Sequence, residues 1–221
     1  MKKAISIFTA VFMAFSLSAC GNNSGNSDTA SAANNTVSDT NAAEITDTKS
    51  DTETQKDQPD NGGNSDILIV YFSETGNTEI LAELIHEQVG GDMFRIEPVT
   101  PYPHGEELFN YTKAEQDNDE RPEISGSVEN MEQYDTVFIG YPIWWYEVPQ
   151  IIKTFLDDYD LSGKKVIPFN THEGSRDGGT YDYIAEQEPD AEVLEGLPIR
   201  GGDMQKDQSE TVQNWLEGLG Y

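Results

Sequence analysis

The chain has 221 residues, enough for one domain with a sizeable core, and it carries 41 acidic against 13 basic residues, a formal net charge of −28. This imbalance excludes nucleic acid and anionic lipid surfaces as favoured partners, because phosphate binding relies on Lys and Arg. It favours a basic or cationic partner, and an acidic surface that serves solubility alone explains the charge equally well.

The N-terminus has the pattern of an export signal. Lys2 and Lys3 precede an apolar stretch over 4–15 that is too short to span a bilayer comfortably. Residues 17–20 (LSAC) follow and resemble the bacterial lipobox, which implies cleavage before Cys20 and diacylglycerol on its sulfur. We therefore expect a lipoprotein signal peptide over 1–19 and a lipid anchor on the extracytoplasmic face of a membrane. An ordinary signal peptide with an incidental Cys is the alternative.

The next segment has the composition of a tether. Residues 21–65 are mostly Ser, Asn, Thr, Asp, Ala and Gly, with Val37 and Ile45 as the exceptions. Such a segment cannot bury enough apolar surface to fold. We expect lipidated Cys20 and the residues up to 65 to form a disordered tether with a root-mean-square reach of ~35–40 Å.

From residue 66 onward the sequence predicts strands that alternate with helices. Continuous apolar, β-branched runs indicate strands buried on both faces, and apolar residues at helical spacing indicate helices. The predicted strands cover 67–72, 93–96, 136–140 and 165–169, with a weak last strand made of 193–194 and 197–199. The predicted helices cover 79–89, 106–115, 148–156, 181–188 and 211–219, and a charged loop is expected over 117–122.

This alternation predicts one α/β domain over 66–221, a doubly wound, five-stranded parallel sheet with helices on both faces. Ligands bind such sheets beyond the C-terminal ends of the strands. The loops that follow the first, third and fourth strands are therefore the candidate binding segments.

The first of these loops is rich in small polar residues. Free N–H groups at a helix start, together with the helix dipole, favour an anion. The loop contains no Lys and matches neither the P-loop nor the dinucleotide fingerprint, so it suits one terminal phosphate. A capped helix start explains the same residues equally well. The candidate residues are Ser73, Glu74, Thr75, Gly76, Asn77 and Thr78.

The second loop places three large aromatic residues at a strand end, between two prolines. Aromatic side chains at such a place offer stacking partners to a flat ligand. Core filling is the alternative, and we expect at least one of the three to be structural. The candidate residues are Pro142, Ile143, Trp144, Trp145 and Tyr146.

The third loop is polar and rich in glycine, so its backbone N–H groups are available to ring carbonyls and nitrogens. His172 is a possible acid or base, although a single His on a loop is more often merely exposed. The candidate residues are Thr171, His172, Glu173, Gly174 and Ser175.

Together the three loops resemble those of a flavodoxin. The segments GYPIWW (140–145) and THEGS (171–175) are similar to a bacterial flavodoxin-like subfamily of single-domain or lipid-anchored proteins. The resemblance implies the strand order 2-1-3-4-5 and one non-covalently bound FMN. It places residues 73–78 around the FMN phosphate, and residues 142–146 and 171–175 beside the isoalloxazine ring. No catalytic nucleophile and no metal site are expected.

One residue departs from the family pattern. Relatives often have a second Gly where this chain has Glu173. A carboxylate near the ring would disfavour the anionic reduced form of the flavin and lower its potential.

The main hypothesis is an extracytoplasmic, membrane-anchored FMN protein that carries electrons to a basic redox partner or reduces a small acceptor. One alternative is an NAD(P)H-dependent flavin reductase of quinones or azo compounds, against which the missing dinucleotide fingerprint argues. The other is a non-redox ligand-binding lipoprotein with the same fold.

Overall fold

The structure, a computed structural model, describes residues 66–221. The predicted signal peptide (1–19), the lipidation site Cys20 and the predicted tether (20–65) lie outside the described residues. Among the helices formed by residues 66–221, none combines the length and the apolar character needed to cross a membrane.

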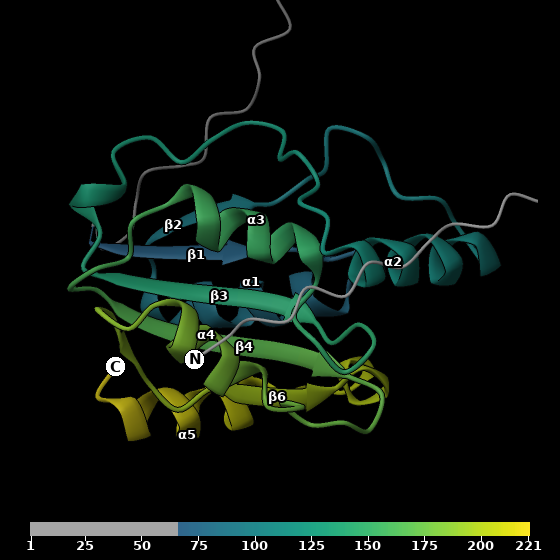
Figure 1. The fold of residues 1–221 in the computed structure, drawn as a ribbon. Helices are drawn as coiled ribbons and strands as arrows, with labels where there is room; N and C mark the ends of the chain where they lie inside the picture. The colour runs from purple at the N-terminus through teal and green to yellow at the C-terminus, as the bar shows by residue number, and fades with distance from the viewer. Residues whose placement is uncertain (1–65) are drawn as a thin grey trace, which may run out of the picture. The chain divides into compact units, whose positions relative to one another are not determined.

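A parallel sheet forms the middle layer of the domain (Figure 1). Its strands are β1 (Ile67–Tyr71), β2 (Asp92–Arg95), β3 (Thr136–Pro142), β4 (Lys165–His172), β5 (Glu192–Val193) and β6 (Leu197–Arg200). The order is β2-β1-β3-β4-β5, and β6 pairs with β4 as well. All five strand pairings are parallel, which confirms the predicted doubly wound order 2-1-3-4-5.

The last position of the sheet differs from the single weak strand that the sequence predicts. Two short strands, β5 and β6, follow each other along the same edge of β4. Between them the chain leaves the ladder, and the Glu195 carbonyl accepts a hydrogen bond from Trp215 Nε1 at 2.9 Å. A Cβ at Gly196 would lie 2.5 Å from the Tyr181 ring, so the chain passes too close to that ring for a larger residue.

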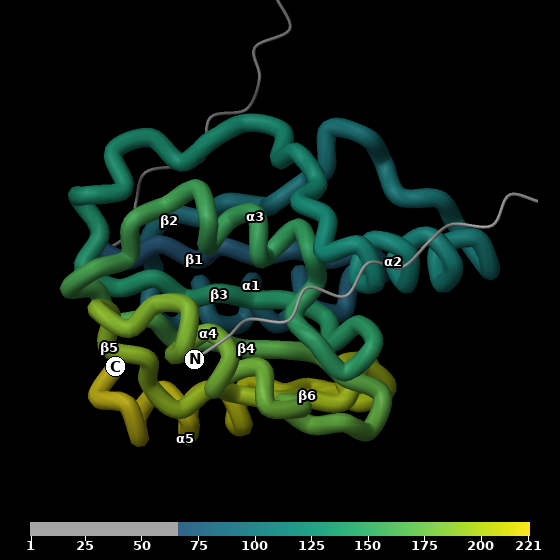
Figure 2. The backbone as a smooth tube through the Cα atoms, viewed as in Figure 1, coloured from purple at the N-terminus to yellow at the C-terminus, as the bar shows by residue number. Residues whose placement is uncertain are grey.

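Helices cover both faces of the sheet, and each face has its own apolar core. The helices are α1 (Asn77–Val89), α2 (Glu106–Asn118), α3 (Gln150–Asp158), α4 (Thr180–Gln187) and α5 (Ser209–Leu219). Residues of α3 and α4, such as Phe155 and Ile184, pack in one core, and residues of α1 and α5, such as Ile85 and Leu216, pack in the other. The smooth trace of Figure 2 shows α1 and α5 on the face opposite α3.

Two strands are longer than predicted. The ladder between β3 and β4 continues beyond the apolar runs and pairs Tyr141 with Asn170 and Pro142 with Thr171. Pro142, Thr171 and His172, predicted as loop residues, therefore belong to strand ends. The physical reason is that backbone pairing does not require apolar side chains, so the strands continue beyond the last residues of the apolar runs.

Helix α2 lies beyond the ends toward which the strand arrows point (Figure 1). It reaches Asn118, so it includes the start of the loop predicted over 117–122. Only Thr112 and Glu115 of this helix are buried. The Tyr102 hydroxyl donates a hydrogen bond to Glu115 at 3.1 Å, and burial raises the pKa of Glu115 to about 7.

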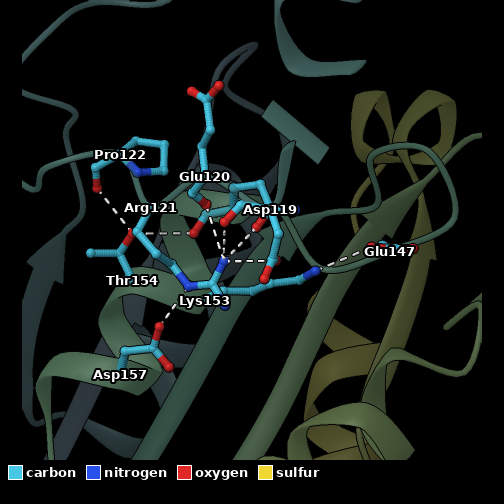
Figure 3. A network of polar contacts seen from close by, with 9 residues as sticks. Asp119, Glu120, Arg121, Pro122, Glu147, Lys153, Thr154 and Asp157 are labelled. Carbon is cyan, nitrogen blue, oxygen red and sulfur yellow. Dashed lines mark hydrogen bonds and ion pairs between the residues drawn. The ribbon is translucent and has the colours of Figure 1, made fainter. Parts of the chain in front are cut away.

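Arg121 fixes the segment after α2 to α3 (Figure 3). Its guanidinium lies 2.5 Å from the Asp157 carboxylate, 2.8 Å from Asp119 and 3.0 Å from the Gln150 amide oxygen. Asp119 itself has a positive φ of 49°. This network sets the direction in which the chain leaves α2.

A Cβ on Gly140 has no space in this core. It would lie 2.2 Å from two atoms of the Phe169 ring, which is fully buried. Gly140→Ala should therefore lower the free energy of unfolding by about 1–3 kcal/mol, as overpacking does. Gly218→Ala in α5 is the control, because a Cβ there meets nothing within 4 Å and Ala is a better helix former. Urea unfolding of the full chain measures both, and equal stability of the two variants would contradict the packing.

The buried carboxyl of Glu115 should make stability depend on pH. Its pKa of about 7 in the folded state exceeds the ordinary value of 4.5, so the folded chain holds this proton more tightly. The associated stability is fully present below pH 4.5 and is lost as the pH rises through about 7. Glu115→Gln should therefore be more stable than the unmodified chain at pH 8, by about 1–3 kcal/mol. Urea unfolding between pH 4.5 and 8 tests this, with exposed Glu210→Gln as the control; parallel pH profiles for all three would refute it.

Candidate functional site

A cavity of about 440 Å³ opens at the C-terminal ends of the central strands. Its volume falls in the usual range of small-molecule sites, roughly 300–1,000 Å³. It is lined by residues from all three predicted loops and from α2, and by Gly201, which directly follows β6. These residues are Thr75, Asn77, Leu108, Phe109, Thr112, Pro142, Ile143, Trp144, Trp145, Thr171, His172, Glu173 and Gly201.

The start of α1 forms one part of this cavity. Gly76 has a φ of 88°, and no side chain caps the helix there. The first backbone bond of the helix runs from Ile80 N to the Gly76 carbonyl at 3.0 Å. Within residues 66–221 the backbone N–H groups of Asn77 and Thr78 have no hydrogen-bond acceptor. These groups, at the positive end of the helix dipole, are suited to bind an anion.

The side chains of the first loop divide into two groups. Thr75 and Asn77 line the cavity, whereas Ser73, Glu74 and Thr78 do not. The buried Ser73 hydroxyl accepts a hydrogen bond from the Glu79 N–H at 3.2 Å, which shows that this hydroxyl braces the loop. Glu74 lines a separate cavity that it shares with Arg95 and His104.

Thr78 connects the first loop to the third. Its hydroxyl shares a buried hydrogen bond of 2.9 Å with the hydroxyl of Thr171, at the end of β4. The sequence predicts both residues as site residues, and their contact fixes the distance between α1 and β4 beneath the cavity. Thr78 therefore stabilises the position of the first loop relative to β4 without lining the cavity itself.

Arg95, at the end of β2, is a supporting residue that the sequence does not reveal. Its guanidinium forms an ion pair with Glu79 and donates a hydrogen bond to the Ser73 carbonyl at 3.3 Å. The sequence around Arg95 contains no pattern from which these contacts with the first loop could be predicted. The contact exists because β2 pairs with β1 and ends beside the loop.

The aromatic residues of the second loop take different positions. Trp144 packs edge-on against Phe72 and Tyr102, with ring centroids 5.2 Å apart in both pairs. This confirms the expectation that at least one of them is structural. Trp145 lines the cavity with 40% of its surface exposed, whereas Tyr146 is 76% exposed and lies outside the cavity lining.

Trp145 and Tyr146 form a tight turn in a conformation that such residues rarely adopt. Their φ angles are 52° and 64°, and Trp144 and Glu147 exchange backbone hydrogen bonds of 2.9 and 3.2 Å across the turn. Two central residues with positive φ define a type I′ turn, for which Asn-Gly is the usual sequence. Left-handed backbone costs about 1–2 kcal/mol for each residue with a Cβ. Strain of this kind concentrates at ligand sites.

The third loop begins inside β4. The Thr171 carbonyl accepts a hydrogen bond from the Ile143 N–H at 2.8 Å, so the second and third loops are joined at the floor of the cavity. His172 Nδ1 accepts the Gly174 N–H at 2.9 Å. Partial burial, and secondarily the charge of Arg176, lowers the pKa of His172. His172 is therefore neutral at pH 7 and shapes the loop through its Nδ1 atom.

Glu173 and Gly201 bring the first and third loops together. The Glu173 carboxylate lines the cavity and lies 3.9 Å from Arg200 Nε. A Cβ on Gly201 would lie 2.7 Å from Glu173 Oε1 and 3.0 Å from Asn77 Nδ2, so a larger residue there would displace the Glu173 carboxylate. Gly174 and Ser175 do not line the cavity. Gly201 was not predicted as a site residue, because its role depends on where β6 ends.

Helix α2 supplies a wall that the sequence does not predict either. Leu108, Phe109 and Thr112 line the cavity, and the Phe109 ring packs edge-on against Trp145 at 6.3 Å. We call these three residues the α2 wall. They lie one helical turn or less apart, so the pattern alone does not distinguish them from an ordinary helix face.

The arrangement combines an aromatic and apolar wall with free backbone N–H groups at the other end. It suits a flat, conjugated ligand that carries one anionic group. Among residues 66–221 there is no group of three or more His, Cys, Asp or Glu side chains that could hold a metal ion.

Known proteins with this arrangement point to one family. The family profile described as Flavodoxin matches residues 66–219 of this chain. A flavodoxin from Synechocystis sp. is 28% identical over 160 residues, which cover 67% of this chain and 78% of that protein. A crystal structure of a candidate flavoprotein from Bacteroides eggerthii has 36% identity and a TM-score of 0.64, and it covers 72% of this chain and 99% of its own.

A more distant structure has the same fold. It is a flavoprotein from Lactobacillus acidophilus in complex with FMN, with 22% identity and a TM-score of 0.56, covering 68% of this chain and 98% of its own. The match of the family profile over most of the chain, together with the sheet order and the site at the strand ends, shows that this chain belongs to the flavodoxin family.

Proposed function

We propose that this flavodoxin binds one FMN without covalent attachment and carries electrons on the extracytoplasmic face of a membrane. The observation that carries the proposal is the meeting of two features in one cavity: the N–H groups of Asn77 and Thr78 without an acceptor at the start of α1, and the aromatic wall around Trp145. The FMN complex of the Lactobacillus acidophilus flavoprotein, which has the same fold, supports the choice of ligand.

The residues present fit the two chemical parts of FMN. A single phosphate needs N–H donors and hydroxyl groups but not the Lys with which a P-loop binds a polyphosphate, and the start of α1 offers such donors with Thr75 and Asn77 at the cavity surface. A Cβ at Gly76 would meet nothing within 4 Å, so the space beside this backbone is open. Trp145 and the α2 wall offer the apolar surface that a flat ring needs.

The cofactor supplies the redox chemistry when it is bound, and the protein's own residues bind it and set its surroundings. His172 is neutral and holds its loop through Nδ1, so it adds no positive charge near neutral pH. Glu173 places a carboxylate at the cavity, where it opposes the arrival of further negative charge.

The proposed location and partner follow from the rest of the chain. The lipobox-like residues 17–20 support lipidation at Cys20 and anchoring to a membrane. The net charge of −28 supports a basic redox partner that is attracted by electrostatic steering.

Reduction of a small acceptor at the expense of NADH or NADPH is the competing function. Multiple-turnover oxidation of either nucleotide by the pure protein would favour it.

Flavin binding can be tested with one loop variant. The purified full chain should take up one FMN and turn yellow. Gly76→Val should weaken FMN binding at least tenfold, because its φ of 88° is unfavourable for Val and the loop would rearrange. Absorbance and fluorescence titration with FMN measures both.

A matched control separates binding from folding. Gly163→Val introduces the same residue at a φ of 76°, also with nothing within 4 Å of the Cβ, but Gly163 lies just before β4, at the end of the sheet opposite the cavity. It should lose similar stability and bind FMN normally. A colourless chain that does not take up added FMN would defeat the proposal.

The carboxylate of Glu173 should lower the reduction potential. Glu173→Gln removes one negative charge from the cavity and should raise the midpoint potential by about 20 mV, the equivalent of roughly 0.5 kcal/mol for an exposed charge and one electron. Spectroelectrochemical titration of the FMN-loaded chain measures the shift. The exposed Glu217→Gln on α5 changes the net charge equally and should leave the potential unchanged. Equal potentials in all three proteins would show that Glu173 has no influence on the ring.

A further inference from the structure

We propose that Thr112 and Gln116 of α2 are positioning residues for flavin binding, because they hold the Trp145–Tyr146 turn in its left-handed conformation before the cofactor arrives. This inference rests on the proposed FMN site and assigns α2 a role in it. The contacts of the turn carry it.

The turn needs external support. Both central residues have positive φ, and neither Trp nor Tyr favours that region. The two backbone hydrogen bonds between Trp144 and Glu147 close the turn, but they do not fix both φ angles, because a type II′ turn with a negative φ at its second central residue closes such a loop as well. The left-handed conformation of both residues persists only where the surrounding structure determines it.

Helix α2 provides this support through two hydrogen bonds to one residue. Trp145 Nε1 donates to Thr112 Oγ1 at 3.0 Å, and Gln116 Nε2 donates to the Trp145 carbonyl at 3.4 Å. Thr112 and Gln116 are four residues apart, so they lie on the same face of the helix. One bond fixes the indole ring and the other fixes the backbone of the same residue.

The Thr112 hydroxyl is itself held in place. It donates to the Leu108 carbonyl one turn earlier at 2.8 Å, and Thr112 is 5% exposed. A hydroxyl whose hydrogen is used in this way presents a lone pair to the indole N–H. The contact is therefore directional, and Val at this position would keep the shape while removing the acceptor.

The far end of the turn is fixed from α3. Lys153 Nζ lies 3.1 Å from the Glu147 carboxylate, a contact that Figure 3 shows beside the Arg121 network. Partial burial would raise the pKa of Glu147, but the Gln116 amide and the Lys153 ammonium outweigh it and hold this pKa below its usual value. Gln116 therefore interacts with Trp145 and with Glu147, the residues before and after Tyr146.

The consequence concerns the surface that meets the flavin. Trp145 and Phe109 line the cavity side by side, and both depend on how α2 sits. With the turn held, Trp145 is ready for ring stacking, and binding need not order it. Without the hydroxyl of Thr112, the free chain would sample other turn conformations and FMN would bind more weakly.

The experiment compares Thr112→Val with Thr112→Ser in the full chain. The chain has three Trp residues, so the apo protein labelled with ¹⁵N should give three indole N–H resonances, and Trp145→Phe identifies the one that belongs to Trp145. In Thr112→Val this resonance should shift and its hydrogen should exchange faster, whereas Thr112→Ser should retain both properties. FMN titration should show binding about 2- to 10-fold weaker in Thr112→Val than in Thr112→Ser, which keeps the acceptor for the indole N–H.

Each outcome decides a separate point. An unmoved indole resonance in Thr112→Val would overturn the hydrogen bond to Trp145. A shifted resonance with the same FMN affinity in both variants would overturn the positioning role. Gln116→Leu, which removes the bond to the Trp145 carbonyl, repeats the comparison if Thr112→Val does not fold. If the unmodified chain binds no FMN, the proposed function fails, and the indole resonance still decides whether α2 holds the turn.

Discussion

The pairing of β3 with β4 up to Pro142 and Thr171 is the constraint on which the site depends. These residues carry the second and third loops, and the ladder places the two loops side by side at one edge of the sheet. The bond from the Ile143 N–H to the Thr171 carbonyl extends this connection past the last ladder pair. The bond between Thr78 and Thr171 then ties the first loop to the same point. A shift in the register of β4 would therefore separate all three loops at once.

The second loop shows how this frame supports a strained segment. The Trp145–Tyr146 turn stores backbone strain that its own sequence does not relieve. Support comes from α2 and α3, two helices that are separated in the chain by β3 and joined in space by Arg121 (Figure 3). The aromatic surface of the cavity thus depends on the second loop, on α2 and on α3. A substitution in any of these segments is expected to affect the position of Trp145.

Electrostatics explains how so acidic a chain can hold an anion. The donors at the start of α1 are backbone N–H groups, whose partial charges do not depend on the composition of the chain. Arg95 stands close to the loop, but it is engaged by Glu79 and the Ser73 carbonyl. Acidic side chains farther away on the surface weaken this site little, because salt screens exposed charges beyond about 8–10 Å.

The sequence by itself determined the alternation of strands and helices, the order of the sheet through its resemblance to flavodoxins, and the three loops that meet at the strand ends. The strands, helices and loops depend on local patterns: apolar runs, helical spacing and clusters of small polar residues, each within about a dozen consecutive residues. The strand order is not local, and it could be predicted only because the loops resemble those of a known family.

Only the tertiary structure decided which side chains face the cavity. Ser73 and Thr78 form hydrogen bonds that support the loops and do not line the cavity, whereas Gly201 and the α2 wall do line it. The tertiary structure also set Trp145 and Tyr146 in a left-handed turn, although nothing in their residue types predicts positive φ. The physical reason is that these outcomes arise from contacts between segments far apart in the chain, such as Thr112 with Trp145, whose energies no local pattern contains.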